Sequence, residues 1–272
     1  MPVNILYCEG VSGSWDIQLL QMLLVNTCNV YPAGGKDNFS AGIQMAREAI
    51  PALSDSIYGL RDRDFDDEKP VPNGQLLEWE ITAQDSKVKL GWRWERKEIE
   101  NYLIDPEVVQ RSLGHPYSHF APPPRDQYEK ELNRVADEIA IYTAARSALS
   151  LSRKPNRLKN SFYPHSTEID CIQHIHEILD SYHAGLPQKQ GVIDQFQVLL
   201  PECKTGGNRR TNFLTFFSGK DLLIGMNNFL THSGFKNWEY FVKAILEGMK
   251  KAQDPVWSWL SEWENLREKI LT

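Results

Sequence analysis

Three carboxylates in the first quarter of the chain follow the ends of two predicted strands. Glu9 comes directly after the apolar run 3–8, and Asp62 and Asp64 come directly after the run 56–61. The carboxyl ends of parallel strands meet at one edge of an open sheet, and ligand sites form there. Since Asp62 and Asp64 are two residues apart in an extended segment, they can face one site together. We therefore expect Glu9, Asp62 and Asp64 to share a site at the carboxyl edge of a sheet.

Carboxylates that come this close repel one another and need a compensating cation. At about 4 Å and an effective dielectric constant of about 20, one pair of like charges costs about 4 kcal/mol. Oxygen ligands without histidine or cysteine favour Mg²⁺ or Mn²⁺, so the pattern predicts a site for one of these ions. The alternative is that residues 62–68, with five carboxylates, form a solvated acidic turn, and that Glu9 is only a charge near a helix N-terminus.

The elements that would position these carboxylates alternate between strand and helix. The expected elements are strands at 3–8, 29–32, 56–61, 76–82 and 89–100, and helices at 14–27 and 38–49. Strands and helices that alternate with short connections predict an α/β fold, a parallel sheet flanked by helices. In a 2-1-3 strand order the first and third strands are neighbours, which brings the carboxylates together.

The chain becomes mainly helical after Pro106. Apolar residues at helical spacing predict helices, and Gly, Pro and basic residues interrupt them. The expected helices are 125–152, 167–183 and 237–251, and the expected basic loops are 155–164 and 204–212. We therefore divide the chain into an α/β domain, 1–105, and a helical domain, 106–272.

The composition limits the class of protein. The chain has 272 residues, 41% of them hydrophobic, and a net charge of −6. No apolar run approaches the roughly 20 residues of a membrane span, and the N-terminus lacks the features of a signal peptide. The four cysteines form no C-x-x-C pair, so neither a zinc ribbon nor a disulfide framework is indicated. We expect a soluble cytoplasmic protein without membrane contact.

Five short stretches of the sequence resemble a known family. Glu-Gly after the first strand (ILYCEG, 5–10) and Asp-x-Asp after the third (IYGLRDRD, 57–64) resemble the TOPRIM fold. GGKD at 34–37, WRWERKEIENYLID at 92–105 and FFSGKDLL at 216–223 resemble the OLD-like TOPRIM nucleases of bacterial anti-phage defence, such as the effectors of the PARIS system. The resemblance covers the α/β part and implies that only 216–223 of the helical part returns to the active site.

The resemblance implies a metal-dependent nuclease that cleaves phosphodiester bonds of DNA or RNA, transfer RNA included, with Mg²⁺ or Mn²⁺ as cofactor. It implies that Glu9 is a metal ligand or general base and that Asp62 and Asp64 are metal ligands. Glu100 would be a ligand of a second metal, and Lys220 would lie near the scissile phosphate. Two metals can hold the attacking and leaving oxygens of such a reaction, and an ammonium can neutralise the developing charge.

Some of these roles have open alternatives. The relatives often carry Asp where this chain has Gly13, and Asp16 follows after a short insertion, so its role is uncertain. Lys220 could be a surface lysine at the start of a helix. Glu100 could form a salt bridge to a basic residue within 93–97.

Positive charge is concentrated in two windows that contain no acidic residue, although the chain as a whole is acidic. The residues that we expect to contact nucleic acid are Arg153, Lys154, Arg157, Lys159, Arg209 and Arg210. Such local positive surface could supply phosphate contacts beside a repulsive acidic site. The alternative for 153–159 is a solvated linker or a surface that docks onto an acidic partner.

The resemblance also implies a partner. Neither Gly-Lys-Asp segment has the spacing of a P-loop, so ATP-driven control would come from another protein. The relatives are toxic effectors that a partner ABC-type ATPase holds inactive. One alternative is a catalytically silent TOPRIM-like binding module that docks to such an ATPase. Another is a structural interaction protein whose helical part forms the interface of a homodimer.

Overall fold

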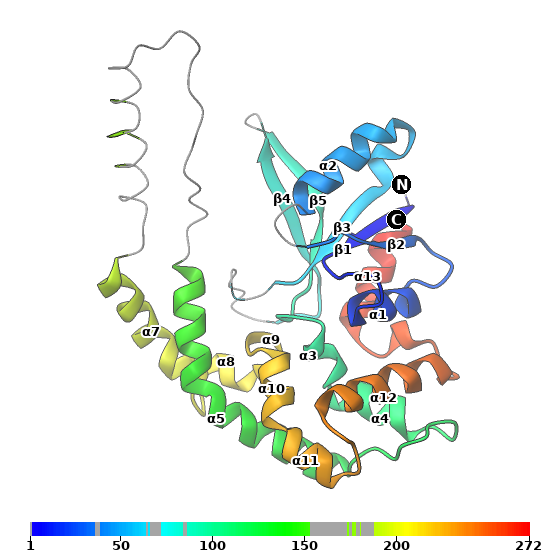
Figure 1. Ribbon diagram of the computed structural model, residues 1–272, viewed down its shortest axis with the longest axis vertical. Coiled ribbons are helices and arrows are strands. Elements are labelled where there is room, and N and C mark those ends of the chain that lie inside the picture. The colour runs from blue at the N-terminus through cyan, green and yellow to red at the C-terminus, as the bar shows by residue number, and fades with distance from the viewer. Residues whose placement is uncertain are drawn as a thin grey trace.

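A five-stranded sheet in the order β2-β1-β3-β5-β4 forms the centre of the fold (Figure 1). The computed structural model describes residues 2–35, 39–63, 65, 72–83, 86–152, 173, 176, 177, 180 and 188–272. The strands are β1 (Ile5–Cys8), β2 (Asn29–Pro32), β3 (Ile57–Arg61), β4 (Leu77–Ala83) and β5 (Ser86–Arg93). The pairs β1–β2, β1–β3 and β3–β5 are parallel, and β4 is antiparallel to β5. The predicted α/β class and the predicted adjacency of the first and third strands are therefore confirmed.

Alternation along the strands builds a core on each face of the sheet. Leu6 of β1 belongs to the large core, and Ile5 packs against the small one. The helix α2 (Phe39–Ala49) covers the small core, where a Cβ on Gly59 would lie 2.5 Å from Ile43 Cδ1. Glycine at position 59 therefore lets α2 approach the central strand.

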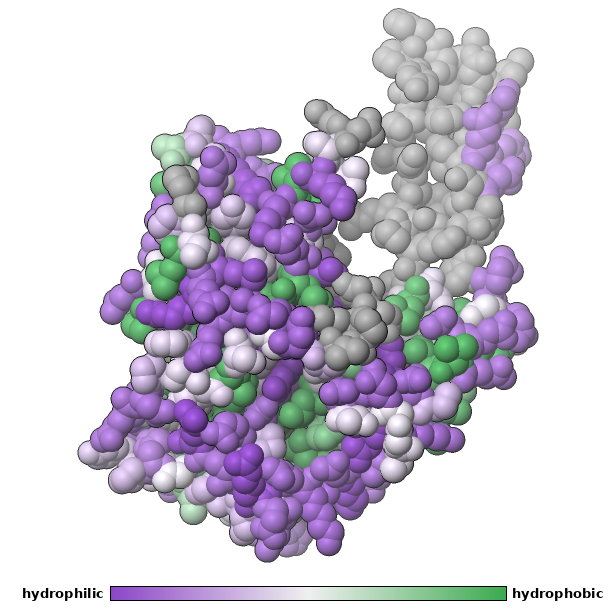
Figure 2. All heavy atoms as spheres, turned by 180° about the vertical axis from the view of Figure 1, so that it is seen from behind, coloured by the Kyte–Doolittle hydropathy of each residue, from purple (hydrophilic) through white to green (hydrophobic). Residues whose placement is uncertain are grey.

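The helical part adds to the large core and does not form a separate one. Its elements within the described residues are α4 (Pro106–Gly114), α5 (Arg125–Leu151), α7 (Lys189–Cys203), α8 (Asn208–Thr211), α9 (Phe213–Phe216), α10 (Gly219–Gly225), α11 (Asn227–His232), α12 (Trp238–Lys251), η2 (Val256–Ser258) and α13 (Ser261–Leu271). The α/β part contains α1 (Trp15–Leu23), η1 (Pro51–Ser56) and α3 (Glu100–Leu103). The same cluster contains Val3 and Ile270, and the Val3 amide donates to the Ile270 carbonyl at 2.8 Å. The domains expected from the sequence thus share one core, and the two ends of the chain lie side by side (Figure 1). Seen from behind, the surface is mainly hydrophilic with separate apolar patches (Figure 2).

Two sequence-based assignments differ from the structure. The expected strand 89–100 ends at Arg93, so Glu100 begins a helix. The chain leaves the sheet there because Trp94 and Ile99 are buried in the large core, which draws the segment away from β5. The expected loop 204–212 contains the helix α8. The expected loop 155–164 and most of the helix 167–183 lie outside the described residues.

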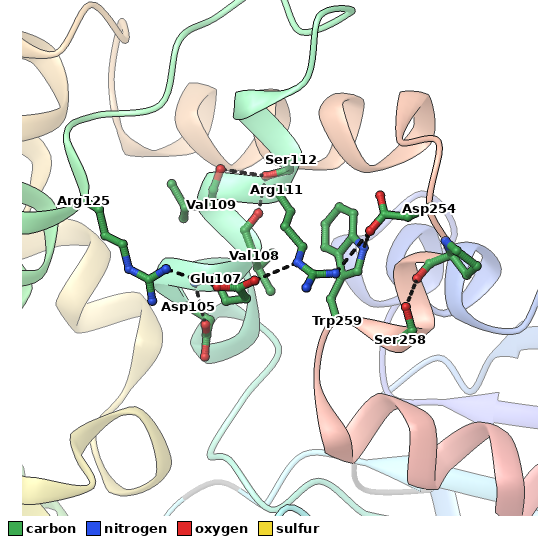
Figure 3. Close-up of polar contacts among 11 residues, drawn as sticks. Asp105, Glu107, Val108, Val109, Arg111, Ser112, Arg125, Asp254, Ser258 and Trp259 are labelled. Atoms are coloured by element: carbon green, nitrogen blue, oxygen red, sulfur yellow. Dashed lines mark hydrogen bonds and ion pairs between the residues drawn. The ribbon is translucent and has the colours of Figure 1, made fainter.

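An ion-pair network ties α4 to its neighbours (Figure 3). Glu107 of α4 contacts Arg111 at 2.7 Å and Arg125, the first residue of α5, at 3.2 Å. Arg111 also reaches Asp254, which follows α12, at 3.2 Å. The same Asp254 carboxylate accepts a hydrogen bond from the Trp259 indole at 2.7 Å. The network therefore fixes the link between α12 and α13 against α4.

We expect Asp254→Ala to lower the free energy of unfolding by about 1–2 kcal/mol, because the indole N–H of the buried Trp259 loses its acceptor. Denaturant unfolding of the variant measures this change. Glu247→Ala is the matched control, since Glu247 makes an exposed pair with Lys250 and its loss should change the stability by less than about 0.5 kcal/mol. Equal changes in the two variants would show that the Trp259 contact contributes nothing.

Candidate functional site

The strand pairing brings Glu9 and Asp62 to the same edge of the sheet. Cys8 of β1 lies opposite Leu60 of β3, so Glu9 and Asp62 follow the ends of neighbouring parallel strands. Burial raises the pKa of the Cys8 thiol to about 12, and the negative charges of Asp16, Asp62 and Glu9 contribute to this increase. The three carboxylates therefore lie close to the end of β1.

Arg61 is a cation of this edge that sequence analysis did not identify. Its Nε lies 3.7 Å from Glu9 Oε1, and both side chains are largely buried. The guanidinium also lies over the ring of Trp79, 5.2 Å from its centroid. Arg61 therefore supplies positive charge beside Glu9 from the neighbouring strand.

Asp16 lies against the turn that follows Glu9. Ser14 caps α1, and Asp16 is in the first turn of that helix. A Cβ on Gly10 would lie 3.2 Å from Asp16 Oδ2 and 2.1 Å from Ser14 Oγ, so the turn leaves no room for a side chain at position 10. Burial raises the pKa of Asp16. The carboxylate whose role the sequence left uncertain is thus at the edge of the sheet.

Glu100 joins this edge from the segment after β5. Burial raises the pKa of Glu100 to about 7, and the negative charges of Glu98 and Asp16 add to the increase. The positive charge of Lys220, the second residue of α10, acts in the opposite direction. Glu98, Glu100, Asp16 and Lys220 therefore lie near one another, although Lys220 is more than 100 residues away in sequence.

The Lys220 side chain is exposed, while the backbone around it is fixed. The Lys220 amide donates to Glu98 Oε1 at 2.8 Å. The sequence signal for Glu98 was weak, because a single glutamate in a charged stretch has no characteristic spacing. Only the contact across the fold identifies it.

The two arginines of the second basic window face into the protein. Arg209 and Arg210 of α8 are only 5% and 8% exposed. Arg210 binds Asp137 at 2.6 Å, and Arg209 lies over the ring of Phe216. Their burial argues against the expected contact with nucleic acid: a basic sequence window does not indicate which way its side chains face. The remaining predicted site residues that lie outside the described residues are Asp64, Arg153, Lys154, Arg157 and Lys159.

The carboxylates at the edge have the right chemistry for a hard cation but do not form a closed cage. Glu9, Asp16, Asp62 and Glu100 all offer oxygen donors, as Mg²⁺ and Mn²⁺ prefer. Among the described residues, which exclude Asp64, no group of three or more His, Cys, Asp or Glu side chains is arranged to hold a metal ion. These oxygen donors suit Mg²⁺ or Mn²⁺, but within the described part of the chain no three of them surround a single point.

Comparison of the chain with protein-family models and with curated protein sequences finds no match. Within the described ranges, no helix combines the length and the apolar character needed to cross a bilayer. The interpretation of the site therefore depends on its own geometry.

The segment that carries Glu98 and Glu100 is anchored by the last helix. Glu262 of α13 accepts a hydrogen bond from the Glu95 amide, and Glu95 in turn accepts from the amides of Asn73 and Gly74 at 2.7 and 2.8 Å. Burial raises the pKa of Glu262 to about 7, and the charge of Glu95 adds to this increase. The segment before the site is therefore held by Glu262, whose carboxyl group ionises less readily in the folded protein than in the unfolded chain.

We expect the wild type to lose about 1–3 kcal/mol of stability through Glu262 as the pH rises from about 4.5 to above 7. The sign follows because the pKa in the folded state, about 7, exceeds the unfolded value of 4.5, so ionisation favours unfolding. Glu262→Gln removes this dependence. Denaturant unfolding of both proteins at pH 5 and pH 8.5 measures it, and the same pH dependence in both would contradict the assignment.

Proposed function

We propose that the chain is a metal-dependent nuclease with a TOPRIM-like α/β part. The observation that carries the proposal is the meeting of five residues at one edge of the sheet. Glu9 and Asp62 follow the ends of adjacent parallel strands, and Asp16, Glu100 and Lys220 reach the same edge from three helices. This combination of oxygen donors with one exposed ammonium suits a phosphodiester substrate.

Each residue has a defined task in this proposal. A bound Mg²⁺ or Mn²⁺ would supply an activated water and charge stabilisation. Glu9, Asp16 and Asp62 would hold the ion from the α/β part. Glu100 would add an oxygen ligand from α3, as the sequence motif predicts for a second metal. The ammonium of Lys220 would stabilise negative charge on the phosphate.

The substrate that we propose is a nucleic acid, DNA or RNA, because a phosphodiester backbone matches this chemistry. The window 153–159 remains the predicted source of backbone contacts, since Arg209 and Arg210 are buried. The proposal includes regulation by a partner ABC-type ATPase and a role as toxic effector in anti-phage defence. Both depend on the resemblance of the sequence motifs.

A second candidate is a TOPRIM-like binding module without cleavage activity. Two observations favour it: the described residues contain no group arranged to hold a metal, and Arg61 already provides a positive charge beside Glu9. Incubation of the protein with Mg²⁺ or Mn²⁺ and a panel of plasmid DNA, single-stranded DNA, a messenger transcript and bulk transfer RNA separates the candidates. Cleavage of any member supports the nuclease.

We expect Glu9→Gln to reduce cleavage at least about 100-fold, because one of the carboxylates proposed to bind the metal loses its negative charge. Glu9 follows the strand and is not in the core, so the free energy of unfolding should change by less than about 1 kcal/mol. Glu264→Gln, at an exposed position of α13, is the matched control for cleavage and stability. A folded Glu9→Gln protein with full activity would refute the assignment of this edge.

Calorimetric titration with Mn²⁺ tests the metal directly. Wild type should bind the ion, and Asp16→Asn combined with Asp62→Asn should abolish binding, because two of the proposed oxygen ligands lose their charge. Glu264→Gln should bind as wild type does. Undiminished binding by the double variant would move the metal site elsewhere in the chain.

A further inference from the structure

The first two residues of α10 and the two residues before them are held by two side chains from the segment after β5. Glu98 Oε1 accepts hydrogen bonds from Ser218 Oγ at 2.6 Å and from the Lys220 amide at 2.8 Å. Asn101 Oδ1 accepts from the Gly219 amide at 3.2 Å, and its Nδ2 donates to the Phe217 carbonyl at 3.0 Å. Residues 217–220, which we call the lysine turn, are therefore bonded to one side of the site at every position.

Close packing reinforces these hydrogen bonds. A Cβ on Gly219 would lie 2.4 Å from the Asn101 amide nitrogen and 2.7 Å from the Glu100 carbonyl carbon. The Ser218 and Asn101 residues are 2% and 0% exposed. At Gly219 the backbone of the lysine turn is thus in contact with the backbone of α3, and a side chain at this position would push the two apart.

The other side of the lysine turn is held by α5. Asp221 forms an ion pair with Arg146 of α5. The Arg146 guanidinium lies 4.6 Å from the ring centroid of Phe65 and 5.3 Å from that of Tyr142. These contacts limit rotation of α10, so Lys220 has its backbone fixed between α3 and α5.

We propose that Glu98 is a positioning residue whose side-chain oxygen sets the place of Lys220 relative to Glu100. The inference rests on the proposed function for its catalytic consequence. One oxygen accepts from the Ser218 hydroxyl and from the Lys220 amide, and both donors are neutral groups, so these two contacts require an acceptor and not a negative charge. Glu98 therefore differs from the carboxylates proposed to hold the metal.

Glu98→Gln and Glu98→Ala separate positioning from charge, because glutamine keeps an oxygen acceptor and alanine removes it. We expect hydrogen exchange of amides 217–221 to rise about tenfold or more in Glu98→Ala and to stay within about threefold of wild type in Glu98→Gln. Glu264→Ala is the control for a surface glutamate, and the α12 amides show whether the change is local.

The same variants are measured in single-turnover cleavage of plasmid DNA and bulk transfer RNA. We expect Glu98→Ala to lose about 100-fold in rate with apparent substrate affinity and Mn²⁺ binding unchanged, and Glu98→Gln to retain most of the rate. In a Lys220→Ala background, Glu98→Ala should cause no further loss, because the two residues act as one unit.

Three results would overturn the proposal: wild-type exchange in Glu98→Ala, an equal loss in both Glu98 variants, or full additivity with Lys220→Ala. A wild type that binds Mn²⁺ but cleaves no member of the panel refutes the proposed nuclease and not the positioning contact. In that case the exchange rates alone decide whether Glu98 fixes the lysine turn.

Discussion

The parallel pairing of β1 with β3 is the constraint on which the rest of the structure depends. Because the two strands run in the same direction and in register, both end at one edge, and whatever follows them must meet there. The helices α1 and α2 connect the parallel strands and cover opposite faces of the sheet. Gly59 makes this arrangement possible by admitting α2 to the centre of the sheet.

This pairing brings several carboxylates to one edge of the sheet. Three features reduce the repulsion among them. Arg61 provides a cation from within the sheet, and Lys220 provides another from the helical part. Burial raises the pKa of Asp16 and Glu100, so these groups ionise less readily. The edge thus combines repulsion among its carboxylates with attraction to Arg61 and Lys220.

The sequence predicted the features that depend on local pattern. The ends of the strands before Glu9 and Asp62 and the helix expected at 237–251 follow from the order of neighbouring residues, and the structure confirms these elements. It could not predict the role of Glu98, because its partners are about 120 residues away and no spacing links them. Nor could it predict that Arg209 and Arg210 face inward, since that depends on the packing of α8 against its neighbours.

The hydrogen bond between Val3 and Ile270 has a consequence for how the protein is made. A ribosome releases β1 long before α13, yet the two contribute to one core. Until α13 has been synthesised, the Glu95 amide cannot donate its hydrogen bond to Glu262, and the segment with Glu98 and Glu100 lacks this support. Such long-range contacts form late, so the nascent chain remains without a complete site through most of translation. The nuclease activity proposed above would therefore begin only after α13 has left the ribosome.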